Sequence, residues 1–198
     1  MLYIIRHGQT EMNSRRLLQG RSDVPLNSRG IAQAEEAALR LRSKGVCFDH
    51  AFSSPLTRAL QTAEILAAGI PVQADIRLIE MDYGPYEGSD LSAPAPELKR
   101  FFEDLIRNPA PAGMEPLQSV VVRSGEFLEE IRSLKGNVLI STHAVSMKGI
   151  LEYLSPDSHG SYWSKYIANC EIYCSEQSEA GFTVPFSLGT GLPVTPGV

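Results

Sequence analysis

The chain has 198 residues, 43% hydrophobic and 21% charged, a composition typical of a globular protein long enough to bury a sizeable core. Its net charge of −5, without any lysine or arginine block, argues against a nucleic-acid-binding protein. No apolar stretch reaches the roughly 20 residues that cross a bilayer. Three cysteines form no disulfide framework, and the N-terminus has no secretion signal, so we expect a reduced, cytoplasmic setting.

The first predicted strand begins almost at the N-terminus. Leu2 to Ile5 is a continuous apolar run, typical of a strand buried on both faces of a parallel sheet. Arg6 and His7 follow at once. Because such sheets bind ligands at the carboxyl ends of their strands, we expect both side chains where small anions bind. Gly8 suits a tight exit at which the backbone approaches a ligand closely.

The next segment, residues 9–27, is polar and predicts a loop whose basic and amide side chains can close over a phosphate. A helix should follow, capped by Asn27 or Ser28 and ending near residues 44–45. Residues 46–53 then predict a second strand.

A helix with an arginine in its first turn is expected after that strand. Ser54 is a favourable N-cap and Pro55 a favourable first helical residue. Arg58 would lie beside free backbone N–H groups at the positive end of the helix dipole, which suits a bound anion. On these grounds alone, Arg58 could equally belong to an ion pair.

An acidic and aromatic loop, residues 78–88, leads into the middle of the chain. Residues 89–116 are rich in proline and alanine around one helix at about 97–107. They depart from the strand–helix alternation, which predicts a small helical insertion that covers the site. An amphipathic helix is expected over residues 117–134.

The last buried strand of the pattern is Val138 to Ser141. Thr142 can cap a helix that starts at His143, which would place this imidazole just past a strand end. Residues 169–175 predict another strand, able to pair with residues 182–186.

This order of elements predicts a three-layer α/β/α fold with a mostly parallel central sheet. We expect one domain over residues 1–186, followed by a flexible C-terminal tail over residues 187–198.

Parallel strands would bring Arg6, His7, Arg58 and His143 to one edge of the sheet. Two guanidiniums and two imidazoles beside a helix N-terminus form a strong site for a phosphoryl group. The same positive charges lower the pKa of a nearby imidazole, so a neutral His7 could act as a nucleophile. A nearby carboxyl group could protonate the leaving alkoxide.

Other short motifs follow in a fixed order along the chain. They are Arg6-His7-Gly8 with Thr10 and Asn13, Gln19-Gly20, Ser53 to Ala59, Leu78-Ile79-Glu80 with Gly84 and Glu87-Gly88, and Ser141-Thr142-His143. Over roughly residues 1–175, these motifs resemble the histidine phosphatase superfamily, the phosphoglycerate mutase-like clan.

The resemblance implies a role for each member of the site. His7 would be the phosphorylated nucleophile, and Arg6, Arg58 and His143 would bind the phosphoryl oxygens. Further contacts to the substrate or its phosphate would come from Thr10, Asn13, Gln19, Gly20 and Ala144. No cofactor is implied, and we expect a small phosphorylated substrate and a monomer or homodimer.

The resemblance also implies that Glu80 donates the proton and later activates water, since its place in the motif favours it over Asp82 and Glu87. Glu87 would be a structural residue of the same loop. A metal site is not expected, because Arg6 and Arg58 would repel the cation.

Two positions depart from the common pattern. Ala144 and Val145 follow His143 where many members have glycines, and Lys148 stands where an arginine is frequent. Ala144 still offers its backbone N–H to a phosphate, whereas the role of Lys148 stays open.

The type of reaction depends on the segment after Glu80. Members of the mutase branch resemble one another in a basic residue directly after this glutamate and in a longer insertion. Here residues 81–83 read Met-Asp-Tyr and the insertion is modest, so the chain is more similar to broad-specificity and α-ribazole phosphatases. A phosphoglycerate mutase is the alternative. A non-catalytic module that binds phosphorylated ligands is less favoured, because the nucleophile and the acid are intact.

The leaving group is expected to meet a partly apolar pocket. The aromatic residues that suggest it are Tyr83, Tyr86, Phe101 and Phe102.

Overall fold

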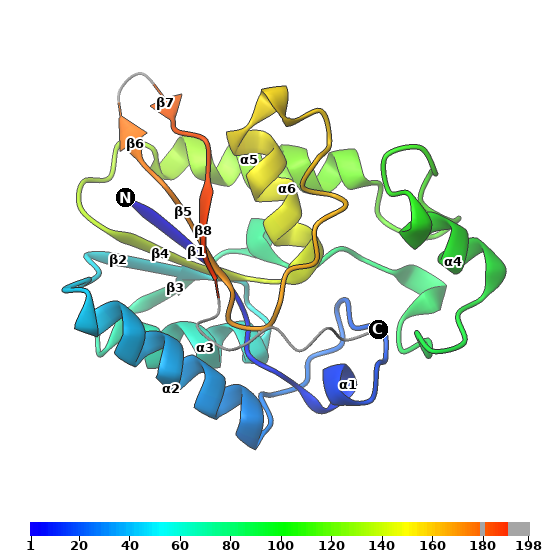
Figure 1. Ribbon diagram of the computed structural model, residues 1–198, viewed down its shortest axis with the longest axis horizontal. Helices are drawn as coiled ribbons and strands as arrows, with labels where there is room; N and C mark the ends of the chain where they lie inside the picture. Colours follow the sequence, from blue (N-terminus) through cyan, green and yellow to red (C-terminus); the bar gives the residue numbers. More distant parts are fainter. Residues whose placement is uncertain (179–180, 190–198) are drawn as a thin grey trace.

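A computed structural model describes residues 1–178 and 181–189, and its centre is a six-stranded sheet of order β3-β2-β4-β1-β5-β8 (Figure 1). The strands are β1 (Leu2–Arg6), β2 (His50–Ser53), β3 (Val72–Ala74), β4 (Val138–Thr142), β5 (Ile172–Ser175) and β8 (Phe186–Gly189). Strands β3, β2, β4 and β1 are parallel, while β5 and β8 are added antiparallel at one edge. The predicted mostly parallel sheet is therefore confirmed.

Helices cover both faces of this sheet (Figure 1). The helices α2 (Ser28–Ser43) and α3 (Thr57–Ala67) pack on one face, where Tyr3 and Ile5 of β1 point. The helices α5 (Leu117–Ile131) and α6 (Ala144–Leu154) pack on the other, against Leu2 and Ile4. This alternation along β1 is what a strand buried on both sides requires, so the predicted three layers are confirmed. Within the described residues, no helix is long and apolar enough to cross a membrane.

The segment of residues 89–116 lies beside the sheet rather than on it (Figure 1). Its helix α4 (Pro96–Glu103) is shorter than predicted. The carboxylate of Asp104 accepts the N–H groups of Ile106 and Arg107, which turns the chain out of the helix. Apolar side chains of the segment form a third core cluster with residues of the site loops: Leu98, Phe101, Leu105 and Met114 with Leu18, Met81, Tyr83 and Val145.

Both predicted caps of the site helices are wrong. Helix α3 begins at Thr57 after Leu56, because the carboxylate of Asp23 accepts the Thr57 N–H at 2.7 Å. Helix α6 begins at Ala144 with His143 in the N-cap position. Thr142 ends β4 instead, and its hydroxyl donates to the Leu78 carbonyl at 2.8 Å. At α6 the carboxylate of Glu80 accepts the N–H groups of Val145 and Ser146, so at both helices a side chain distant in the sequence takes over the role expected of a local one.

The remaining elements refine the predicted loops. The loop after β1 contains a short helix, α1 (Glu11–Ser14), and three 3₁₀ turns are η1 (Ile76–Leu78), η2 (Gly84–Tyr86) and η3 (Pro156–Ser158). The predicted second strand, residues 46–53, is shorter in the structure. It comprises β2 alone, and residues 46–49 lie outside it.

The C-terminal pairing also differs from the prediction. Residues 187–189 belong to β8, which pairs with β5, so they are not part of a tail. Phe182 lies in a separate two-stranded ribbon of β6 (Gln177–Ser178) and β7 (Gly181–Phe182). The rest of the predicted tail, residues 190–198, lies outside the described residues.

Candidate active site

The side chains predicted to meet at the edge of the sheet do meet there. His7 follows β1 and His143 follows the adjacent β4, and their ring centroids are 5.0 Å apart. Arg58, in the first turn of α3 after β2, reaches the same point, with its Nε 3.2 Å from Nε2 of His7. Arg6, the last residue of β1, lines the same cavity as His7. Because β4 lies between β1 and β2, three strand ends converge on one imidazole.

His7 is held in one orientation and one tautomer. Its Nδ1 lies 2.6 Å from the Gly8 carbonyl, so Nδ1 carries the proton and donates it. Nε2 then carries the lone pair and faces Arg58. Burial above all, with the charges of Arg58 and Arg6, lowers the pKa of His7 well below its ordinary value. The imidazole is therefore neutral and can attack phosphorus.

Gly8 is required for a reason other than the predicted one. A Cβ here would lie 2.4 Å from the carbonyl oxygen of Gly30 at the start of α2. The close approach is therefore to the backbone of another helix, and it brings α2 against the exit of β1.

Arg58 is completely buried, and carbonyl groups hold its guanidinium. Nη1 donates to the carbonyl of Ser22 and Nη2 to that of Gly20, each at 2.7 Å. Burial lowers the pKa of Arg58 to about 10, so the group is still a cation at neutral pH. Because Nε donates to Nε2 of His7 at 3.2 Å, two of its five N–H groups are left for a phosphoryl group.

Glu87 supports Arg58 through the loop of residues 20–22. Its carboxylate accepts the backbone N–H groups of Gly20 at 2.9 Å, Ser22 at 3.2 Å and Arg21 at 3.3 Å. The carbonyls of the same loop accept from Arg58. Gly20, a predicted phosphate contact, therefore lies behind Arg58 and acts on it through its carbonyl.

Replacing Glu87 with alanine is expected to lower the free energy of unfolding by about 1–3 kcal/mol, since backbone donors lose their acceptor. The activity should also fall, because Arg58 loses the fixed carbonyls that orient it. Urea unfolding and steady-state kinetics check both effects. Glu87→Gln keeps one acceptor oxygen and should lose less, and an alanine variant with unchanged stability would contradict this role.

Glu80 is buried against the N-terminus of α6. Its Oε1 accepts the N–H of Met81 at 2.8 Å and that of Ser146 at 2.9 Å. Its Oε2 accepts the N–H of Val145 at 3.1 Å. The carboxyl group thus caps α6, whose N-cap residue is His143, and it also lines the cavity that His7 lines. Glu80 and His143 are consequently positioned by the same helix turn.

The amide residues of the first loop form a connected network. Gln19 Oε1 accepts from the Thr10 hydroxyl at 2.7 Å and from Asn13 Nδ2 at 3.2 Å. Thr10 is completely buried and caps α1, whereas Asn13 and Gln19 line the cavity. Ala144, the first residue of α6, lines it as well. Of this predicted set, Thr10 and Gly20 do not line the cavity.

Two positioning residues were missed by the sequence analysis. Asn169 donates to the His7 carbonyl at 2.9 Å and to Asn13 Oδ1 at 3.3 Å. The hydroxyl of Ser54, predicted as a cap, lies 2.7 Å from Nε2 of His143. Asn169 follows no recognisable motif, so only the folded chain reveals its role.

Three buried nitrogen atoms around His7 have no partner within the part of the chain that the structure describes. They are Nε of Arg6, Nε2 of Gln19 and Nδ1 of His143. Buried polar atoms are rarely unpaired in folded proteins. These three come from three different segments and can all donate, so they match a ligand rich in acceptor oxygens, such as a phosphoryl group.

The cavity beside these groups has a volume of about 500 Å³. Its polar end is formed by Arg6, His7, Asn13, Gln19 and Glu80, whereas Arg58 and His143 contact His7 but do not line it. Its wall is mostly apolar. The apolar lining consists of Leu17, Leu18, Leu91, Pro94, Ala144 and Val145, together with the rings of Tyr83, Phe102 and Tyr166. Of the four aromatic residues expected here, only Tyr83 and Phe102 line the cavity, and Phe101 is buried in the core. Across residues 1–178 and 181–189, no cluster of His, Cys, Asp or Glu side chains is arranged to hold a metal ion.

Acidification is expected to destabilise the folded protein through His7 and His143. Burial, then neighbouring charges, lowers the pKa of both imidazoles well below the ordinary value of about 6.5. Below that pH the unfolded chain protonates these residues while the folded chain does not, so unfolding takes up protons. Stability should therefore fall from about pH 6.5 downward, by up to about 1.4 kcal/mol per pH unit for each histidine.

Urea unfolding at about pH 7 and pH 5.5 measures this loss. The His7→Ala variant should show a shallower dependence, because one of the two groups is gone. An equal dependence in both proteins would contradict the pKa assigned to His7.

The fold and the site together define an α/β protein built to bind a phosphoryl group beside a neutral, oriented histidine. Residues 2–186 match the family model of the histidine phosphatase superfamily, branch 1. The chain belongs to this superfamily and is one of its enzymes, a phosphatase or a mutase.

Similar proteins include both kinds. The chain is 31% identical over 175 residues to a 2,3-bisphosphoglycerate-dependent phosphoglycerate mutase of Bradyrhizobium diazoefficiens, covering 79% of this chain and 83% of that one. A mutant phosphoserine phosphatase of Entamoeba histolytica in complex with phosphoserine has a TM-score of 0.81 at 25% identity, covering 96% and 97% of the two chains. A putative α-ribazole-5′-P phosphatase of Escherichia coli has a TM-score of 0.79 at 26% identity, covering 95% of each.

Proposed function

We propose that this protein is a metal-independent phosphomonoester hydrolase that acts on a small phosphorylated metabolite through a phosphohistidine at His7. The observation that carries the proposal is the orientation of His7, whose Nδ1 is hydrogen-bonded to the Gly8 carbonyl and whose Nε2 is directed toward Nε of Arg58. A fixed lone pair beside a cation is what an attack on a phosphoryl group needs.

The first step forms a bond from His7 Nε2 to phosphorus and breaks the bond from phosphorus to the ester oxygen. Arg6, Arg58 and His143 bind the phosphoryl oxygens, with Asn13 as a further contact. Their positive charge and N–H groups stabilise the charge that builds up in the transition state, an effect worth several kcal/mol. Glu80 donates a proton to the leaving alkoxide.

The second step returns the enzyme to its starting state. The Glu80 carboxylate takes a proton from a water molecule, whose oxygen attacks phosphorus as the bond to His7 Nε2 breaks. Inorganic phosphate leaves, Glu80 is protonated again and His7 is neutral. Glu80 lines the cavity next to His7 and can serve both steps.

The residue after Glu80 favours a hydrolase over a phosphoglycerate mutase. Met81 is completely buried in the core, so this position contributes no cation to the cavity. Asp82, the next residue, forms an ion pair with Arg21 at 3.1 Å. A mutase must retain a substrate with two phosphates, and the wall away from the phosphoryl end is mostly apolar, with the carboxylate of Glu103 beside Lys99 and Lys148. The similarity to curated mutases keeps the mutase as the second candidate.

Phosphate release from p-nitrophenyl phosphate in EDTA tests the proposal, followed by an assay with 3-phosphoglycerate and its bisphosphate primer. We expect p-nitrophenol and phosphate in the first assay, and phosphate rather than 2-phosphoglycerate in the second. Interconversion of the phosphoglycerates without net phosphate release would establish the mutase. Binding of phosphorylated compounds without either reaction would establish a non-catalytic module.

A further inference from the structure

The proposed reaction does not use Lys148, whose role the sequence left open. It lies on α6, five residues after His143, and its side chain is half-buried and lines the active-site cavity. Its Nζ donates to the Trp163 carbonyl at 2.9 Å. Among the described residues it has no carboxylate within ion-pair distance, and an ammonium group has two further N–H donors.

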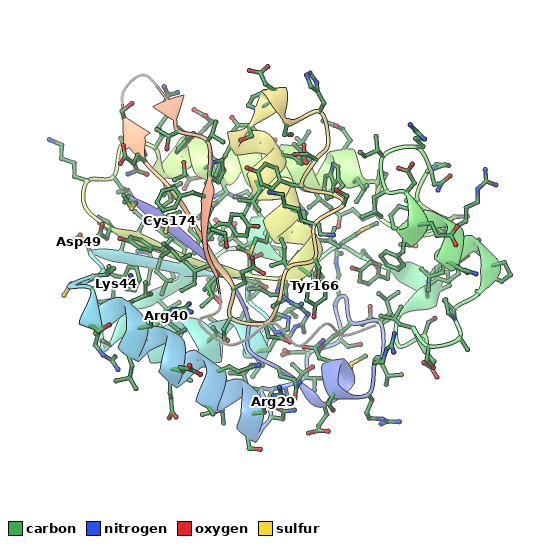
Figure 2. All side chains as sticks on the ribbon, viewed as in Figure 1. Arg29, Arg40, Lys44, Asp49, Tyr166 and Cys174 are labelled. Atoms are coloured by element: carbon green, nitrogen blue, oxygen red, sulfur yellow. The ribbon has the colours of Figure 1, made fainter. Side chains whose placement is uncertain are left out.

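Lys148 lines two cavities at once. A second cavity, of about 510 Å³, lies between residues 102–106 and residues 163–166. The two cavities share four lining residues, namely Phe102, Glu103, Lys148 and Tyr166. Tyr166, labelled in Figure 2, belongs to the segment that joins α6 to β5 and is largely exposed. Lys148 therefore lies where the active-site cavity meets the second cavity, and a substrate that extends from the phosphoryl group into the second cavity would pass it.

A half-buried ammonium without an acidic partner is costly. Burial is the main cause that lowers the pKa of Lys148 to about 8. The charge of Glu80 raises this pKa, and the charge of Arg6 lowers it. The other charged groups that line the two cavities are Lys99, Glu103, Asp104 and Lys165. An anion bound to Lys148 would use its remaining donors and stabilise its charge.

We propose that Lys148 binds a carboxylate in the alcohol part of the substrate, so that the enzyme selects phosphomonoesters whose leaving group is itself an anion. This inference rests on the proposed hydrolase and names its substrate class. A singly charged carboxylate fits better than a second phosphate, because Glu103 lines the same stretch as Lys148 and its carboxylate lies 3.9 Å from Nζ of Lys99.

The test compares 3-phosphoglycerate with glycerol 3-phosphate, which has a hydroxymethyl group in place of the carboxylate. The measured quantity is the ratio of the two kcat/KM values. Wild type should prefer the carboxylate ester, and Lys148→Met should lower the ratio about tenfold or more. Lys148→Arg, which keeps the charge, should retain most of it. Lys99→Met removes another cation from the same cavity and serves as the matched control, with a smaller change expected.

The ratio should also fall in wild type as the pH rises from about 7 to 9, because the ammonium loses its proton. In Lys148→Arg the ratio should stay level, since a guanidinium keeps its charge. A wild-type ratio near one, or an equal loss of both activities in Lys148→Met, would overturn the proposal.

Binding separates a failure of this inference from a failure of the hydrolase proposal. In calorimetry, the His7→Ala variant should bind 3-phosphoglycerate about tenfold or more tightly than the His7→Ala, Lys148→Met double variant. This holds whether the wild type is a hydrolase or a mutase. Equal affinities of the two variants would overturn the role of Lys148, even if phosphate release has confirmed the hydrolase.

Discussion

Replacing His7 with alanine is expected to abolish turnover, with a loss of at least about 10⁴-fold, because alanine removes the nucleophile that takes up the phosphoryl group. Arg6, Arg58 and His143 would still bind the substrate, so affinity should persist while the chemical step disappears. Phosphate release from p-nitrophenyl phosphate measures the loss.

The control for His7→Ala is a histidine outside the site. His159 is exposed, with a φ of 51°, a conformation that asparagine tolerates well. The His159→Asn variant should keep wild-type activity. A His7→Ala protein with wild-type turnover would rule out a covalent intermediate on this residue.

Replacing Glu80 with glutamine is expected to slow turnover by about 10²–10⁴-fold, because the amide can neither donate the proton nor activate water. The loss in the first step should be greatest with alkyl phosphates, whose alkoxides need a proton, and least with p-nitrophenyl phosphate. A series of esters with leaving groups of increasing basicity, measured in single turnovers, checks this dependence.

The control for Glu80→Gln is Asp82→Asn, since Asp82 is the neighbouring carboxyl group that the sequence left as a candidate acid. Asp82 is paired with Arg21 and does not line the cavity, so its loss should leave the dependence on the leaving group as in wild type. If Asp82→Asn steepened this dependence and Glu80→Gln did not, the two roles would have to be exchanged.

The parts of the site that follow buried strands could be predicted from the sequence. Arg6, His7 and His143 come directly after apolar runs, and parallel strands leave one common edge for such residues. Arg58 was placed in the first turn of its helix although the cap was wrong, because a helix start is fixed to within a few residues by its apolar pattern.

The supporting contacts could not be predicted, because each joins segments far apart in the sequence. Asp23 caps α3, Glu80 caps α6, and Asn169 fixes the His7 carbonyl. A local pattern says nothing about such partners. The same holds for Glu87, whose motif was recognised but whose three backbone contacts to residues 20–22 appear only in the folded chain.

The most direct test of the account is to locate the phosphate on the enzyme. In Glu80→Gln, p-nitrophenyl phosphate can still phosphorylate His7, because p-nitrophenolate leaves without a proton, whereas hydrolysis of the phosphoenzyme lacks its base. Quenching at alkaline pH, which preserves phosphohistidine, and peptide mass spectrometry should find the phosphate on the tryptic peptide that begins at His7. The His7→Ala, Glu80→Gln double variant should carry none. Phosphate on any other residue, or turnover without a phosphorylated enzyme, would contradict the account.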